Sequence, residues 1–68
     1  MNYTHYKIWT GPYDVNRIAG ALKDAGIGGV FAGTEHVYFN GSPDKIEALL
    51  QVERILGYRF QYSDVKYA

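Results

Sequence analysis

The sequence predicts an α+β domain in which four antiparallel strands form a sheet and two helices cover one face of it. Two observations support this prediction. Turn signals divide the 68 residues into six segments, and the apolar spacing within them switches between the two-residue period of strands and the 3.6-residue period of helices. The predicted order is strand, helix, strand, strand, helix, strand.

The first predicted strand, residues 3–10, organises the rest of the chain. It is rich in aromatic and β-branched residues, which suit a pleated, half-buried surface, and a Gly-Pro pair at residues 11–12 ends it. Alternation points Tyr6 and Ile8 toward a core. The opposite face then carries three side chains, His5, Lys7 and Trp9.

The first helix is predicted to begin at Val15. Its apolar residues follow the i, i+3, i+4, i+7 spacing of one buried stripe. They are Val15, Ile18, Ala19, Leu22 and Ala25. Asp14 is the predicted N-cap, and Gly26 suits the left-handed position that ends a helix.

Residues 27–32 are predicted as the second strand. The glycines within it indicate a bulge or a close backbone approach, so the face that Phe31 takes stays open. A turn at 33–34 leads into the third strand, residues 35–39. Its alternation separates two pairs of side chains, Val37 and Phe39 on one face, His36 and Tyr38 on the other.

The second helix has the clearest start signal. Ser42 is the predicted N-cap, Pro43 the first helical position and Asp44 a first-turn acid. The helix is predicted to reach Leu56 and end at Gly57. Its predicted core side consists of Ile46, Leu49, Val52 and Leu56, with Leu50 at the edge.

Glu53 is unusual because it projects inside the apolar arc of this helix. An unpaired buried carboxylate is costly, so Glu53 either reaches the core edge, lies in a frayed last turn or has a function. Residues 58–62 alternate as a fourth strand. Residues 63–68 form a polar tail that extends this strand or docks on a partner. The whole chain, 1–68, is predicted to be a single domain.

The order βαββαβ corresponds to the split βαβ, or ferredoxin-like, arrangement. Its two right-handed crossovers place the first and third strands in the middle of the sheet and both helices on one face. The other face is left uncovered. This uncovered face is the candidate functional surface.

Composition narrows the function. Seven basic and seven acidic residues give a formal net charge of zero, which argues against a dominant attraction to nucleic acid or membrane. There is no cysteine, and two histidines do not suffice for a structural zinc site. We therefore expect no metal and no cofactor. Without a signal-peptide pattern the expected location is cytoplasmic, and a small unstapled domain favours a homodimer.

The leading hypothesis is a protein-binding module that uses this uncovered face. Trp9 and Tyr38 would form an apolar patch, and such patches mark interaction sites. His36, Lys7 and His5 would complete the binding set. Small inhibitors and adaptors, including those carried by phages, work in this way.

Two resemblances support other hypotheses. The placement of Trp9, His36 and Tyr38 on the two central strands, with Lys7 nearby, resembles the layout of RNA-recognition-motif domains, which implies RNA or single-stranded DNA binding. Residues 10–15 (TGPYDV) resemble the strand-to-helix loop of ACT-like regulatory domains, and residues 25–27 resemble their helix exit. That resemblance implies a dimer holding an amino acid or nucleotide. Its ligand loop would include Gly11, Tyr13 and Asp14, beside helical amide groups able to hold an anion.

Catalysis is not predicted. The available acid–base groups are His5, His36, Asp14, Glu35 and Glu53. His5 and His36 would be neighbours on adjacent strands, but the chain has no nucleophile–base–orienter set, phosphate loop or metal-ligand spacing. We therefore expect a protein that is not an enzyme.

Overall fold

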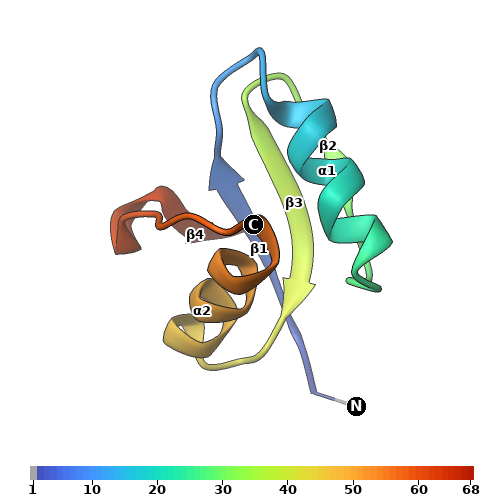
Figure 1. Cartoon of the computed structure of the whole chain (residues 1–68). Coiled ribbons are helices and arrows are strands. Elements are labelled where there is room, and N and C mark those ends of the chain that lie inside the picture. The colour runs from blue at the N-terminus through green and yellow to red at the C-terminus, as the bar shows by residue number, and fades with distance from the viewer. Residues whose placement is uncertain (1) are drawn as a thin grey trace.

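The computed structural model describes residues 2–68 (Figure 1). The chain forms a four-stranded sheet, in which all paired strands are antiparallel, and two α-helices. The elements are β1 (Thr4–Trp9), α1 (Val15–Asp24), β2 (Phe31–Ala32), β3 (His36–Gly41), α2 (Lys45–Leu56), the 3-10 helix η1 (Tyr62–Asp64) and β4 (Val65–Tyr67). No helix in residues 2–68 is long and apolar enough to cross a membrane.

The strands β1 and β3 form the centre of the sheet, whose order is β2-β3-β1-β4. They pair along the whole length of both strands, and Tyr6 lies opposite Phe39 and Ile8 opposite Val37. Figure 1 shows this long central pair, with the much shorter β2 partly hidden behind α1. One parity of each central strand therefore forms a continuous apolar surface.

The helices and the sheet share one hydrophobic core. Tyr6, Ile8, Val37 and Phe39 are each at most 1% exposed. The helices and β4 contribute the other buried residues, which are Val15, Ile18, Ala19, Leu22, Ala48, Leu49, Val52 and Val65. Since the buried residues of both helices belong to one cluster with the core-facing residues of β1 and β3, the two helices cover the same face of the sheet.

The structure confirms α1, including its start at Val15, and differs from the prediction in two details near its ends. Asp14 occupies the cap position without a side-chain capping hydrogen bond, and its carboxylate instead lies 3.5 Å from the Arg17 guanidinium. Ala25, predicted to continue the buried stripe, is exposed because the helix ends at Asp24. Gly26 follows with φ +86°, the left-handed conformation predicted for it.

The second strand is shorter than predicted. Residues 27–30 have no strand pairing, and only Phe31 and Ala32 pair with β3. Gly29 has φ +65°, and a Cβ atom there would overlap the Asn40 side chain. The glycines thus allow a close backbone approach to β3, one of the two explanations that the sequence offered.

The helix α2 begins later than predicted. Asp44, rather than Ser42, is the N-cap, and its carboxylate accepts a hydrogen bond from the Ile46 N–H at 3.0 Å. Ser42 Oγ accepts from the Asp44 N–H at 3.2 Å and so supports the cap from outside. Pro43 therefore precedes the helix. Gly57 ends it with φ +79°, as predicted.

The buried side of α2 is also rotated from the predicted one. Ile46, predicted in the core, is 57% exposed. Ala48 faces the sheet instead, where a Cβ atom at Gly41 would lie only 2.9 Å from the Ala48 Cβ. The helix and β3 therefore approach each other closely at Gly41 and Ala48. A large side chain such as that of Ile46 at this contact would hold them further apart.

The fourth strand lies outside the predicted segment 58–62. Residues 58–61 form a loop, and the strand that pairs with β1 is β4, within the segment 63–68 expected as a tail. The Glu53 carboxylate accepts a hydrogen bond from the Phe60 N–H at 2.8 Å, which attaches the loop to α2 and satisfies this half-buried acid. Val65 is then fully buried and brings β4 to the sheet.

Candidate functional site

The side of the sheet opposite the helices presents a set of side chains that we call the open face. Strand alternation puts them there, because each neighbours a core-facing residue in β1, β3, β4 or β2. The open face consists of His5, Lys7, Trp9, Phe31, His36, Tyr38, Asn40 and Lys66. All five residues predicted for binding on the uncovered face lie on it.

Aromatic rings form a row across one part of the open face. Tyr38 is at its centre, with its ring centroid 6.1 Å from that of Phe31 and 6.1 Å from that of His5. The His5 ring stacks on Tyr38, whereas Phe31 is tilted against it. A Cβ atom at Gly33 would lie 3.1 Å from the Tyr38 ring, so the glycine makes room for this ring. Phe31 ends the row and is 64% exposed.

His5 is held in place by a second contact. Its Nδ1 lies 2.6 Å from Asn40 Oδ1, a hydrogen bond in which the histidine Nδ1–H donates to the amide oxygen. The Asn40 backbone N–H donates to the Gly28 carbonyl at 2.9 Å, which attaches the loop before β2 to the same position. The orientation of His5 is therefore set by the sheet, and its Nε2 is left for other partners.

Trp9 lies apart from the aromatic row. Trp9 pairs with His36 at one end of the central strands. His5 pairs with Asn40 at the other end. Trp9 is 51% exposed, and part of its ring lies against Gly11. His5 and His36 are consequently at opposite ends of the β1–β3 pair, and the prediction that they are neighbours is wrong. The antiparallel register separates them.

The charges of the open face all have one sign. The four strands contain Lys7 and Lys66 but no aspartate or glutamate in the residues that the structure describes. These two lysines lie directly opposite each other on β1 and β4. Lys7 was predicted from the alternation of β1, whereas Lys66 was not predicted, because residues 63–68 were expected to form a tail. Phe31 was also left unplaced, since only the pairing of Phe31 with Tyr38 decides its face.

The loop between β1 and α1 does not form a converging site. Gly11 has φ +80° and is buried, whereas Tyr13 is 96% exposed. The Asp14 carboxylate lies near Arg17. These three residues, predicted as a ligand loop, therefore do not face a common space. The amide groups of the first turn of α1 have no side-chain cap from Asp14.

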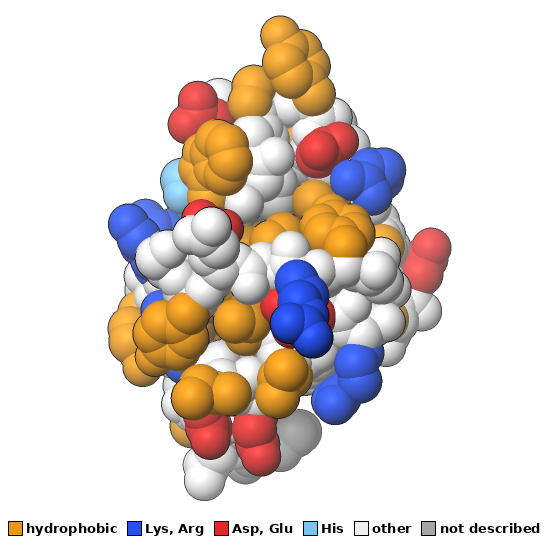
Figure 2. Space-filling view, turned by 60° about the vertical axis from the view of Figure 1, so that its left-hand side comes forward, with side chains coloured by type: hydrophobic (Ala, Val, Ile, Leu, Met, Phe, Trp, Pro, Cys, Tyr) orange, Lys and Arg blue, Asp and Glu red, His pale blue; other side chains and the backbone are white. Residues whose placement is uncertain are grey.

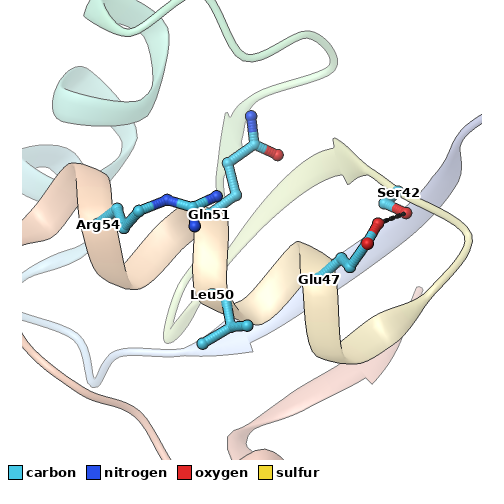
Figure 3. Close-up of a pocket in the computed structure, with 5 residues that line it drawn as sticks. All are labelled: Ser42, Glu47, Leu50, Gln51 and Arg54. Carbon is cyan, nitrogen blue, oxygen red and sulfur yellow. Dashed lines mark hydrogen bonds between the residues drawn. The ribbon is translucent and has the colours of Figure 1, made fainter.

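The side of the molecule with α2 and β4 is more mixed in character. Figure 2 shows hydrophobic side chains there in separate groups, with acidic and basic side chains between them. A shallow hollow of about 340 Å³ runs along α2 and is lined by Ser42, Glu47, Leu50, Gln51 and Arg54. Figure 3 shows Glu47, Leu50, Gln51 and Arg54 spread along the helix and Ser42 on the segment before it, with only the Ser42–Glu47 hydrogen bond of 3.2 Å between these side chains. No set of groups converges in this hollow.

Other chemistry has little basis in the residues described. Within residues 2–68, no three histidine, cysteine, aspartate or glutamate side chains are grouped so that they could hold a metal ion. No family model matches the chain, and searches of the curated proteins and of the solved structures return no match. The open face is therefore the candidate functional surface that the described residues support best.

Proposed function

We propose that this protein is a non-enzymatic protein-binding module that acts through its open face, as a small inhibitor or adaptor of a larger protein. The observation behind the proposal is the exposure of two large apolar side chains on the open face, Phe31 at 64% and Trp9 at 51%. Aromatic side chains provide most of the binding energy at protein interfaces when a partner buries them.

The proposed arrangement of the chain is ferredoxin-like. Support comes from the sheet order β2-β3-β1-β4, the antiparallel pairing throughout, and a helix in each crossover, after β1 and after β3. This arrangement matters for function because both helices lie on one face of the sheet. The open face is then available over both central strands at once.

A protein partner fits this surface better than a small molecule does. The hollow along α2, and a second one at the C-terminal end of α2 that is lined by Leu50, Glu53, Arg54, Gly57, Tyr58 and Arg59, include no open-face residue, and small-molecule sites are concave. Phe31 lies on the edge strand β2 opposite Tyr38, and Trp9 lies two strands away on β1, opposite His36. A partner that contacts both must be at least as broad as the central strand pair. A second copy of this chain satisfies that condition as well as a different protein does.

The test compares open-face variants with an aromatic control. Trp9→Ala and Phe31→Ala each remove an exposed ring from the open face, and Tyr13→Ala removes a still more exposed ring from the loop before α1. Each folded variant is immobilised and exposed to a cytosolic lysate, and native mass spectrometry of the free protein reports self-association. We expect each open-face substitution to weaken capture or dimerisation by about 2 kcal/mol, with no effect from Tyr13→Ala.

The proposal fails if Trp9→Ala and Phe31→Ala leave both capture and oligomeric state unchanged. It also fails if Trp9→Ala unfolds the domain while binding survives, because Trp9 would then belong to the core. Circular dichroism and thermal unfolding of every variant separate these two results from a genuine loss of binding.

A further inference from the structure

We infer that the partner of the open face is an acidic protein surface, whose carboxylates are bound by the Lys7–Lys66 pair while Trp9 and Phe31 bind apolar groups beside them. This inference rests on the proposed function and specifies the chemistry of its partner. It depends on where the charged side chains lie in the fold, which the formal net charge of zero does not reveal.

The chain keeps its acidic groups off the open face. It contains seven carboxylate side chains, and all of them lie in loops, helices or η1, outside the four strands. They are Asp14, Asp24, Glu35, Asp44, Glu47, Glu53 and Asp64. Both lysines of the strands and both histidines of the chain, in contrast, are on the open face. The surface proposed for binding is therefore basic although the protein as a whole is neutral.

The two lysines occupy an unfavourable arrangement in the free protein. Lys7 and Lys66 are directly opposite each other on adjacent antiparallel strands, where like charges destabilise the sheet. Neither forms an ion pair within residues 2–68. Asp64, the acid nearest to Lys66 in the chain, uses its Oδ2 to accept a hydrogen bond from the Gln61 N–H at 3.3 Å. A partner carboxylate would supply the missing counter-charge.

The surroundings of this pair favour a charged partner that also carries apolar groups. Lys7 is half-buried and lies opposite Tyr38 on its other side. Docking of a partner would remove water from the two ammonium groups, which strengthens their attraction to carboxylates. The exposed rings of Phe31, opposite Tyr38 on β2, and of Trp9, on β1, lie on the same face as this pair.

The same charge count argues against nucleic acid. Two lysines neutralise about two phosphates, so affinity for a single strand would fall with a slope of about −1.4 against salt concentration on logarithmic scales. Typical nucleic-acid binders use about six to ten phosphate contacts. Two charges are sufficient, however, for a pair of carboxylates on a protein surface.

The test uses three defined probes and the whole chain. The probes are a random glutamate–tyrosine copolymer, a lysine–tyrosine copolymer with the opposite charge, and an oligodeoxythymidylate matched in charge to the first. Binding is followed by ¹H–¹⁵N NMR at low salt. The variant Lys7→Gln/Lys66→Gln is compared with Lys23→Gln/Arg59→Gln, which removes the same charge from exposed positions outside the strands.

We expect the glutamate–tyrosine copolymer to shift the amide signals of Lys7, Tyr38 and Lys66. Loss of the lysine pair should weaken that binding about tenfold, as expected for two partly exposed charge pairs, while the control variant binds like the wild type. The lysine–tyrosine copolymer should not bind. Equal binding by the Lys7→Gln/Lys66→Gln variant, or no shift at the open face, overturns the inference. Tighter binding of the oligonucleotide at these residues also overturns it.

Failure of this inference is distinguishable from failure of the proposed function. If the captured partner depends on Trp9 and Phe31 but not on the two lysines, the open face binds protein and only its acidic preference is wrong. If the rings and the lysines are both dispensable for capture, both proposals fail together.

Discussion

The two faces of the β1–β3 pair differ in what they require of their side chains. On the core face, Tyr6, Ile8, Val37 and Phe39 are each at most 1% exposed. On the open face, one residue away along each strand, Trp9 is 51% exposed and Lys7 lies opposite Lys66 without a counter-charge. The same backbone hydrogen bonds hold both sets in place.

If the open face binds a partner, as proposed, folding and binding use different side chains of the same strands. The core face is close-packed, so a change of even one methylene affects stability. The open face contains a like-charged pair and exposed rings, which contribute little to a stable monomer. The packing of the monomer therefore does not account for the composition of the open face, whereas the proposed partner would.

The largest expected effect is on the core face. Phe39→Ala removes a ring that is 1% exposed and 5.6 Å from the ring of Tyr6. We expect a loss of about 3–5 kcal/mol of unfolding free energy, which would unfold much of so small a domain. Urea unfolding measures this loss. If Phe31→Ala on the open face costs as much, the two faces do not differ in the way described.

A smaller effect is expected where the core face meets the loop before α2. The Tyr6 hydroxyl donates a hydrogen bond of 2.6 Å to the Ser42 carbonyl, so Tyr6→Phe should cost about 1 kcal/mol near pH 7. Burial raises the pKa of Tyr6, and neighbouring Tyr67 raises it further. The folded state therefore favours the neutral phenol.

The pH dependence of that effect has a definite sign. The stabilisation from Tyr6 is fully present below the unfolded-state pKa of about 10 and is lost as the pH rises above it. The wild type should thus lose its advantage over Tyr6→Phe in alkaline solution. Paired urea titrations near neutral pH and above about pH 10 test this. A constant difference would mean that the Tyr6 hydroxyl does not titrate with folding.

The smallest effect should have the opposite sign. Lys66→Gln removes a like-charge contact with Lys7, so we expect the variant to be more stable than the wild type by about 0.2–1 kcal/mol. Thermal unfolding at low salt measures the difference, and added salt should reduce it by screening the lysines. The control Lys23→Gln, on α1, should show no such gain. A destabilised Lys66→Gln would mean that the lysine contributes to packing.

The candidate site was predicted best where it depends on local alternation alone. His5, Lys7 and Trp9 follow from the parity of β1, and His36 and Tyr38 from that of β3. Phe31 did not follow, because the glycines before it remove the alternation on which parity depends. Its side is decided by pairing with β3, a contact between different parts of the chain.

The sequence by itself determined both helices, the central strands and the two faces of these strands. Apolar periodicity and the glycines that end helices and strands are local signals, which act within a few residues. Only the tertiary structure decided the final strand. The alternating segment 58–62 and the real strand β4 both contain aromatic residues, so local propensity does not separate them. Attachment of Phe60 to Glu53 and burial of Val65 in the shared core make β4 the strand that completes the sheet. A local sequence pattern contains neither the Glu53–Phe60 contact nor the burial of Val65, because both depend on how the whole chain folds.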